Sequence, residues 1–186
     1  PQYLISEILC GSVFTLLTLV ALPQFTEIQV CCFFLYFCLL YSLSVIDFQH
    51  LILPDGLVSL LLWSGLLGSV LGTTDIAPRS AICGAALAWL LLYTLMAAYE
   101  KLRGREGLGY GDVKLMAAIT AWLGMEKLPE LILWSAGSGI IVYLLCTVLN
   151  KRRSLDEDHP ESAKHYIPFG PSIAMAGLVM FFIERL

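Results

Sequence analysis

Residues 80–99 read SAICGAALAWLLLYTLMAAY, twenty consecutive residues without a charged side chain. Folded as a helix at about 1.5 Å per residue, such a run matches the roughly 30 Å hydrocarbon core of a bilayer. Further uncharged windows of similar length occupy 8–26, 28–46, 56–74, 131–150 and 165–183. These six windows indicate a protein that crosses a membrane several times.

The composition of the 186 residues supports this interpretation. Hydrophobic residues make up 58% of the chain and charged residues 14%, whereas soluble domains are roughly half apolar and a quarter charged. The apolar runs lack alternation and are too long for membrane strands of about ten residues. We therefore predict an all-α fold, a polytopic membrane helix bundle with lipid as its surroundings. A pI of about 5.3 gives no support for a nucleic-acid partner.

Seven transmembrane helices are predicted, at about 5–22, 29–47, 57–73, 79–100, 113–125, 130–149 and 171–184. The fifth rests on a shorter uncharged window, which covers only about 17 Å and predicts a short or partly sunken helix. Small residues four apart predict close helix packing at three places: Gly68 and Gly72, Gly84 and Ala88, and Ser135 and Gly139.

Positive charges are unevenly divided between the two sides that this topology defines. The loops after the second, fourth and sixth predicted helices lie on the same side as the N-terminus. That side holds Lys101, Arg103, Arg105, Lys114, Lys151, Arg152, Arg153 and Lys164. The other side holds Arg79, Lys127 and Arg185. Because basic loops stay in the cytoplasm, we predict a cytoplasmic N-terminus and a C-terminus on the outer side.

Cysteine and histidine give no pattern typical of a metal site. The six cysteines, at positions 10, 31, 32, 38, 83 and 146, lie in apolar windows and form no CxxC pair. We interpret them as small apolar packing residues. The three histidines, at positions 50, 159 and 165, lie in predicted cytoplasmic loops and form no ligand cluster, so no metal is predicted.

Two acidic residues stand out by their position. Asp47 directly follows an apolar run, and Asp112 ends the glycine-rich stretch GLGYG and opens the short fifth helix. Both lie at predicted cytoplasmic helix ends, and an ionisable group below the headgroups is costly enough to be a functional candidate. Taken singly, Asp112 also fits a helix N-cap and Asp47 an ordinary interfacial acid.

Taken together, the two carboxyls indicate aspartic hydrolysis. Two carboxyls within a few Å of each other share one proton, because both cannot readily ionise. The carboxylate can then take a proton from water while the carboxylic acid polarises a peptide carbonyl. Gly109 and Gly111 allow a substrate strand to come close. The glycines are not a dinucleotide loop, since no βαβ unit surrounds them.

These residues resemble the type IV prepilin peptidases, leader peptidases of the GxGD aspartyl protease class (peptidase family A24). The resemblance rests on GYGDVKL at 109–115, on Asp47 followed by Pro54 and Asp55, and on IPFGP at 167–171. Tyr3, Glu7 and Gly11 are also similar to the start of the family's peptidase half. The resemblance covers essentially the whole chain.

The resemblance implies that Asp47 and Asp112 are the catalytic pair. The supporting motif positions that it implies are Gly109, Gly111, Lys114, Pro54, Asp55, Pro168, Gly170 and Pro171. It implies an endopeptidase in the bacterial inner membrane, acting at the cytoplasmic face. The substrates would be type IV prepilins and type II secretion pseudopilins, which carry a short basic leader before an apolar helix. Because that leader is basic, acidic residues are expected to contact it, with Glu106 as a candidate.

The family often also N-methylates its product, using S-adenosylmethionine and a preceding cytoplasmic segment with paired CxxC zinc ligands. This sequence has no such pairs, so we expect residues 1–186 to form the peptidase domain without the methyltransferase segment. On that expectation the peptidase needs no cofactor, and zinc and S-adenosylmethionine belong to the missing segment alone.

Two other classes of protein remain alternatives. A proton-coupled transporter also carries carboxylates in its membrane helices, but it places them near the bilayer midplane on broken helices. Asp47 and Asp112 instead lie at the ends of predicted spans. A non-catalytic assembly scaffold needs neither acid.

Overall fold

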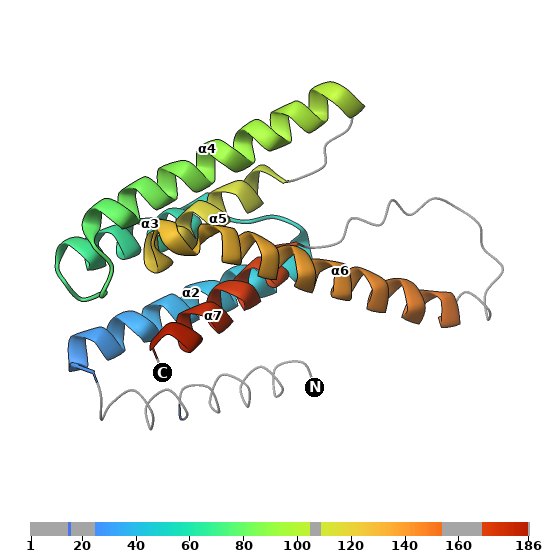
Figure 1. The fold of residues 1–186 in the computed structure, drawn as a ribbon. Coiled ribbons are helices and arrows are strands. Elements are labelled where there is room, and N and C mark those ends of the chain that lie inside the picture. The colour runs from blue at the N-terminus through green and yellow to red at the C-terminus, as the bar shows by residue number, and fades with distance from the viewer. Residues whose placement is uncertain (1–14, 16–24, 105–108, 154–168, 186) are drawn as a thin grey trace.

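The computed structural model describes residues 15, 25–104, 109–153 and 169–185, with residues 145–153 described by their backbone alone (Figure 1). The helices are α2 (Glu27–His50), α3 (Asp55–Val70), α4 (Pro78–Arg103), α5 (Tyr110–Leu123), α6 (Leu128–Arg153) and α7 (Gly170–Arg185). A short 3₁₀ helix, η1 (Met125–Lys127), connects α5 to α6. The described residues contain no strand, which confirms the all-α class. Six predicted helices have counterparts, and the one predicted at 5–22 lies outside the described residues except for residue 15.

The helix boundaries follow local sequence signals. Thr26 caps α2 with a capping box, in which its hydroxyl accepts from the Gln29 N–H and Gln29 Oε1 accepts from the Thr26 N–H. Pro78 occupies the first position of α4, where its missing N–H costs nothing. Gly104 ends that helix with a φ of 63°, which glycine adopts without strain.

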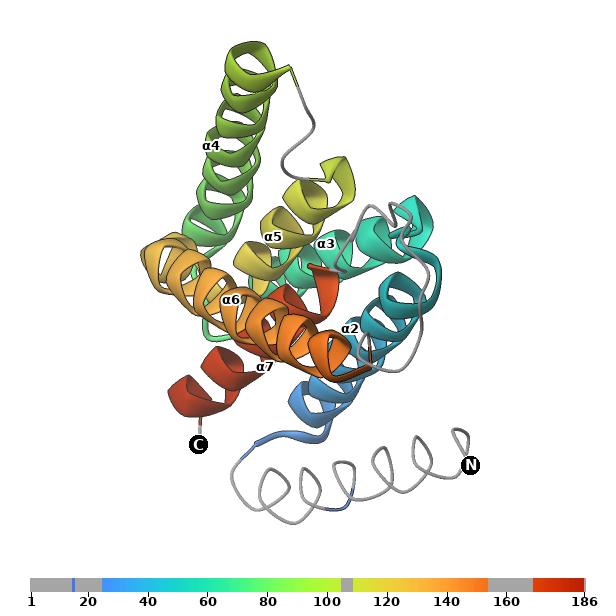
Figure 2. The same ribbon diagram turned by 90° about the vertical axis from the view of Figure 1, so that its right-hand side faces the viewer.

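Helix α5 forms the centre of the bundle. Its buried side chains are Val113 and every residue from Leu115 to Leu123. It packs chiefly against α4 and α3, with α7 on a further side (Figures 1 and 2). Its 14 residues reach about 21 Å, less than the hydrocarbon thickness. The prediction of a short fifth helix is confirmed, and protein rather than lipid surrounds it.

The outer face of α4 is apolar, whereas its inner face is built from small residues. Ala81, Gly84, Ala85 and Ala88 are buried against the bundle. The exposed large side chains of the same helix include Ile82, Leu87, Trp89, Leu90, Leu95 and Leu102. An extended exposed apolar surface of this kind fits contact with lipid. Of the described helices, α2 and α4 are long and apolar enough to cross a membrane, and α3 and α7 are shorter apolar helices.

Two of the three predicted small-residue contacts are found. A Cβ at Gly84 would lie 2.9 Å from the Met125 nitrogen, and one at Gly139 would lie 2.6 Å from the Phe169 ring. Gly72 instead follows the end of α3 with a φ of 69° and has no neighbour within 4 Å of its Cβ position. The Gly68 and Gly72 pair therefore shapes a turn rather than a helix contact.

Four of the six cysteines are described with their side chains, and these are less buried than the sequence interpretation assumed; Cys10 and the side chain of Cys146 lie outside the described part of the chain. Cys31, Cys38 and Cys83 are exposed, and Cys32 is half-buried. Exposed apolar side chains lie on the same helices as these thiols. These described cysteines therefore lie on or near the exposed apolar surface of the bundle rather than in its core.

Candidate active site

Asp47 lies in the last turn of α2 with 6% of its surface exposed. Its Oδ2 accepts a hydrogen bond of 2.9 Å from the N–H of Gly170, the first residue of α7. A Cβ at Gly170 would lie 2.6 Å from the same oxygen and 2.9 Å from the carboxyl carbon. Only glycine allows the backbone to approach this carboxyl so closely. The carboxyl of Asp47 is therefore held in place by the start of a helix far along the chain.

Asp112 is the third residue of α5, and Gly109 rather than Asp112 is the N-cap. A backbone hydrogen bond from Gly109 reaches the Asp112 carboxyl, and a Cβ at Gly109 would lie 3.0 Å from Oδ2. The acid thus lies inside the first turn, where a carboxylate interacts favourably with the helix dipole. The N-cap alternative for Asp112 is wrong, because α5 begins earlier than the sequence predicted.

The structure brings the two aspartates to the same end of the bundle. The Asp47 carboxyl is close enough to act electrostatically on Asp112. The linker between α2 and α3 contributes to this arrangement, since a Cβ at Gly111 would lie 3.0 Å from the Leu53 side chain. The first turn of α5 therefore packs tightly against the chain that follows Asp47.

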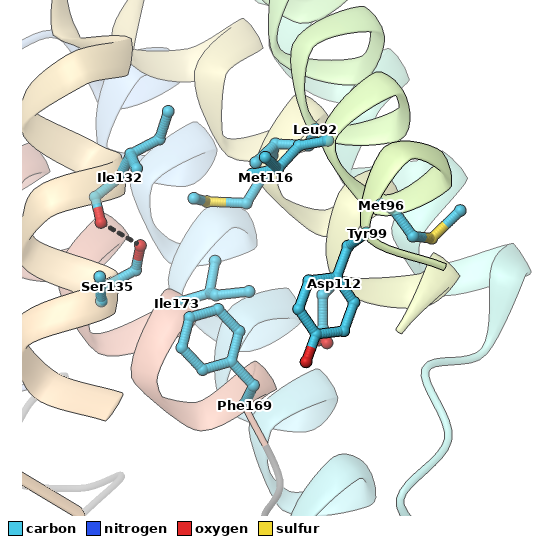
Figure 3. Close-up of a pocket in the computed structure, with 11 residues that line it drawn as sticks. Leu92, Met96, Tyr99, Asp112, Met116, Ile132, Ser135, Phe169 and Ile173 are labelled. Carbon is cyan, nitrogen blue, oxygen red and sulfur yellow. Dashed lines mark hydrogen bonds between the residues drawn. The ribbon is translucent and has the colours of Figure 1, made fainter. Parts of the chain in front are cut away.

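An apolar cavity of about 410 Å³ opens beside Asp112 (Figure 3). Helices α4, α5, α6 and the start of α7 surround it. Its described lining residues are Leu92, Leu95, Met96, Tyr99, Asp112, Met116, Ile132, Ser135, Ala136, Phe169 and Ile173. Asp112 is the one residue with a carboxyl among them, and most of the others are apolar.

Lys114 pairs with Asp55 at this end of the molecule. Its Nζ lies 2.7 Å from Asp55 Oδ1 and 4.5 Å from the centre of the Tyr110 ring. Asp55 is the first residue of α3, with Pro54 as the N-cap. Asp55 therefore opens a helix. The ion pair joins the starts of α3 and α5.

Of the other positions predicted for the site, one lies at this end of the molecule and two fall outside the described residues. Pro171 is the second residue of α7, beside the Gly170 contact with Asp47. Pro168 and Glu106 lie outside the described residues. The sequence reasoning missed the cavity-lining residues of α4, which are Leu92, Leu95, Met96 and Tyr99. Nothing in the sequence separates them from the other large apolar residues of the same helix, which are exposed and do not line the cavity.

Among the described residues, no group of three or more His, Cys, Asp or Glu side chains could hold a metal ion. The chemical groups that the site offers are two carboxyls, backbone N–H donors and an apolar cavity.

Fold and site together define a class: a helical bundle with exposed apolar surfaces and two aspartates at one end. The model of the type IV leader peptidase family matches residues 32–145, and the chain belongs to this family. The family that the sequence resembles is thereby confirmed. No solved structure matches the chain.

Curated relatives carry the name prepilin leader peptidase/N-methyltransferase. The protein of Burkholderia pseudomallei (strain 1026b) is 40% identical over 143 residues, which are 77% of this chain and 43% of that protein. That of Pectobacterium carotovorum subsp. carotovorum is 41% identical over 139 residues, 75% of this chain and 46% of that protein. That of Escherichia coli (strain K12) is 38% identical over 162 residues, 86% of this chain and 66% of that protein. The chain thus spans about half the length of the first two.

Proposed function

We propose that this chain is an aspartic endopeptidase that removes the short basic leader of type IV prepilins and type II secretion pseudopilins. The observation that carries the proposal is that Asp47 and Asp112 lie at the same end of an apolar bundle: Asp47 accepts from the Gly170 N–H, and the adjacent Phe169 lines the cavity together with Asp112. Membership of the leader peptidase family supports it, as does the name of the relatives.

The proposed reaction is hydrolysis of one peptide bond. One carboxylate takes a proton from a water molecule, and the water oxygen bonds to the peptide carbonyl carbon. The other carboxyl, protonated, donates a hydrogen bond to the carbonyl oxygen. The C–N bond then breaks as the leaving nitrogen takes from the first carboxyl the proton that it removed from water, so the nitrogen leaves as the amine and both carboxyls return to their starting states. The Gly170 N–H keeps the Asp47 carboxyl oriented throughout.

The proposal places the site at the cytoplasmic face of the bacterial inner membrane, with seven spans and a cytoplasmic N-terminus. The basic residues Lys101 and Arg103 at the end of α4 support this orientation, because basic helix ends face the cytoplasm. The exposed apolar faces of α4 and α6 support lipid as the surrounding partner.

The test is cleavage of a purified prepilin by the purified chain in lipid. We expect a product shortened by its leader, and loss of that product with Asp47→Asn or Asp112→Asn. Full cleavage by either variant, or none by the unaltered folded chain, would overturn the proposal. A transporter or a scaffold would yield no trimmed pilin.

A further inference from the structure

The cavity beside Asp112 extends from the carboxyl into the bundle. Tyr99 lies next to Asp112, whereas Leu92 lies next to Met116 (Figure 3). Met116 is one helical turn beyond Asp112 on α5, and Leu92 is seven residues from Tyr99 on α4, a distance of about 10 Å along the helix. Asp112 therefore lies at one end of the cavity, and the part of the cavity that extends away from it along α4 and α5 is lined by apolar side chains.

The two walls of the cavity belong to helices that pack separately. Helix α4 packs chiefly against α5, and α6 chiefly against α7. Leu95 of α4 and Ala136 of α6 both line the cavity and are exposed. The cavity thus opens between α4 and α6 at the apolar outer surface, where an apolar chain can enter without crossing water.

Helix α6 contributes Ile132 and two small residues, Ser135 and Ala136, to the cavity wall. Ser135 is 1% exposed, and its hydroxyl donates to the carbonyls of Leu131 at 2.7 Å and Ile132 at 3.0 Å. Because the Ser135 hydroxyl hydrogen-bonds to carbonyls of its own helix, it is not available to a bound molecule, and Ser135 matters to the cavity through its small size. Ala136 does the same at the outer edge.

We infer that this cavity binds the apolar residues that directly follow the scissile bond, and that Ser135 and Ala136 set the largest side chain it accepts. The inference rests on the proposed function. The residues on both sides of a peptide bond that reaches Asp112 lie within about 3.5 Å of it, so the side chain of one of them lies at the cavity. A basic leader residue does not fit there, because an unpaired charge in apolar surroundings is costly.

The volume agrees with this occupant. Ligand cavities of about 300–1,000 Å³ bury most of a drug-sized molecule, so about 410 Å³ accommodates a large apolar side chain together with part of its neighbour. A single methyl group would leave most of the space empty. Cleavage should consequently favour a large apolar residue over alanine after the scissile bond.

The experiment uses three variants of the full chain in lipid and prepilins with Ala, Leu or Phe after the scissile bond. Ser135→Leu and Ala136→Leu each fill the cavity from α6. Gly137→Leu is the matched control. Gly137 is an exposed residue of the same helix, and a Cβ at this position would have no neighbour within 4 Å. The unaltered chain should prefer Leu or Phe to Ala by about 10-fold or more in kcat/KM, the scale of apolar pocket discrimination.

The two cavity variants should lower kcat/KM for Leu and Phe substrates about 10-fold while leaving the Ala substrate within about 3-fold. Gly137→Leu should keep the original preference. If Ser135→Leu does not accumulate, Ala136→Leu at the exposed edge gives the answer. Unchanged preferences in the folded variants, or an equal loss for all three substrates, would overturn the cavity assignment while cleavage itself still stands. If the unaltered chain cleaves none of the three, the proposed function fails instead.

Discussion

Asp47 and Asp112 are the same amino acid in different surroundings. Asp47 is buried and accepts from the Gly170 N–H, whereas Asp112 is half-buried and lines an apolar cavity. Each asparagine substitution keeps the side-chain shape and removes the ionisable group. Each should therefore lose nearly all cleavage without losing the fold.

The two aspartates should act as one unit. We expect the double variant Asp47→Asn with Asp112→Asn to cleave little more slowly than either single variant. Catalysis needs both carboxyls, so one substitution already leaves the remaining aspartate without the partner it needs. Single-turnover cleavage rates in lipid measure this. Asp55→Asn is the control and should have the smaller effect, since Asp55 is exposed and lies on α3. Losses that multiply in the double variant would contradict the shared role.

The ion pair of Lys114 and Asp55 should make a modest contribution. Asp55 is 73% exposed, and solvent screening limits such pairs to about 1 kcal/mol or less. Lys114→Met should fold and slow cleavage at most a few-fold. The charge exchange, Asp55→Lys with Lys114→Asp, should recover part of that loss in unfolding midpoint and in rate. If Lys114→Met fails to accumulate, the lysine is required for folding.

At the scale of elements, α3 and α5 depend on one glycine. A Cβ at Gly65 would lie 2.6 Å from the Trp122 ring, whose indole N–H donates to the Leu61 carbonyl at 2.8 Å. Gly65→Ala should destabilise the bundle by about 1–3 kcal/mol through overpacking. Gly56→Ala, on the same helix with an open Cβ position, is the control and should be neutral or stabilising. Thermal unfolding in one detergent compares them, and equal midpoints would contradict the contact.

The turn after α5 contains a pH-dependent contact. Ser80 donates to Glu126 Oε2 at 2.6 Å and accepts from the Met125 N–H, and the Ser80 hydrogen bond lowers the pKa of Glu126. A lowered pKa means that this stabilisation is present above the pKa of an unfolded Glu, about 4.3, and is lost as the pH falls through the folded value. Glu126→Gln should unfold slightly earlier at pH 7, and the difference should close under acid. A difference that is the same at both pH values would refute the charge effect.

At the scale of the whole molecule, the two ends of the bundle should face opposite sides of the membrane. The contacts of Asp47 with Gly170 and of Lys114 with Asp55 define one end. The contacts of Ser80 with Glu126 and of Lys127 with Glu184 define the other. The topology that we propose places the first end in the cytoplasm.

Reporter fusions test this orientation. A phosphatase that folds only outside the cytoplasm should be active when fused after Gly72, at the turn that follows α3, and inactive after Gly104, at the end of α4. A fluorescent protein that folds only in the cytoplasm should give the reverse pattern. The opposite result for both reporters would invert the topology and the proposed face of cleavage.

Much of the helix layout was predictable from the sequence. An uncharged run in lipid must satisfy its backbone N–H and C=O groups internally, which leaves helices as the solution for these segments. The predicted helices at 29–47 and 79–100 accordingly correspond to Glu27–His50 and Pro78–Arg103. The aspartates also stood out, because a charge beside an apolar run is conspicuous without any knowledge of packing.

Packing alone decided which faces of those helices meet. The hydrogen bond between Asp47 and Gly170 joins residues 123 positions apart, and the ion pair of Lys114 with Asp55 spans 59. In a membrane protein, core and lipid-facing residues are equally apolar, so the pattern of hydrophobicity does not tell them apart. The sequence by itself therefore determined the helices, the family and the two candidate acids. The tertiary structure decided that α5 is central, that Asp47 is held by the start of α7, and that a cavity opens beside Asp112, because each depends on shapes that fit only once the helices are assembled.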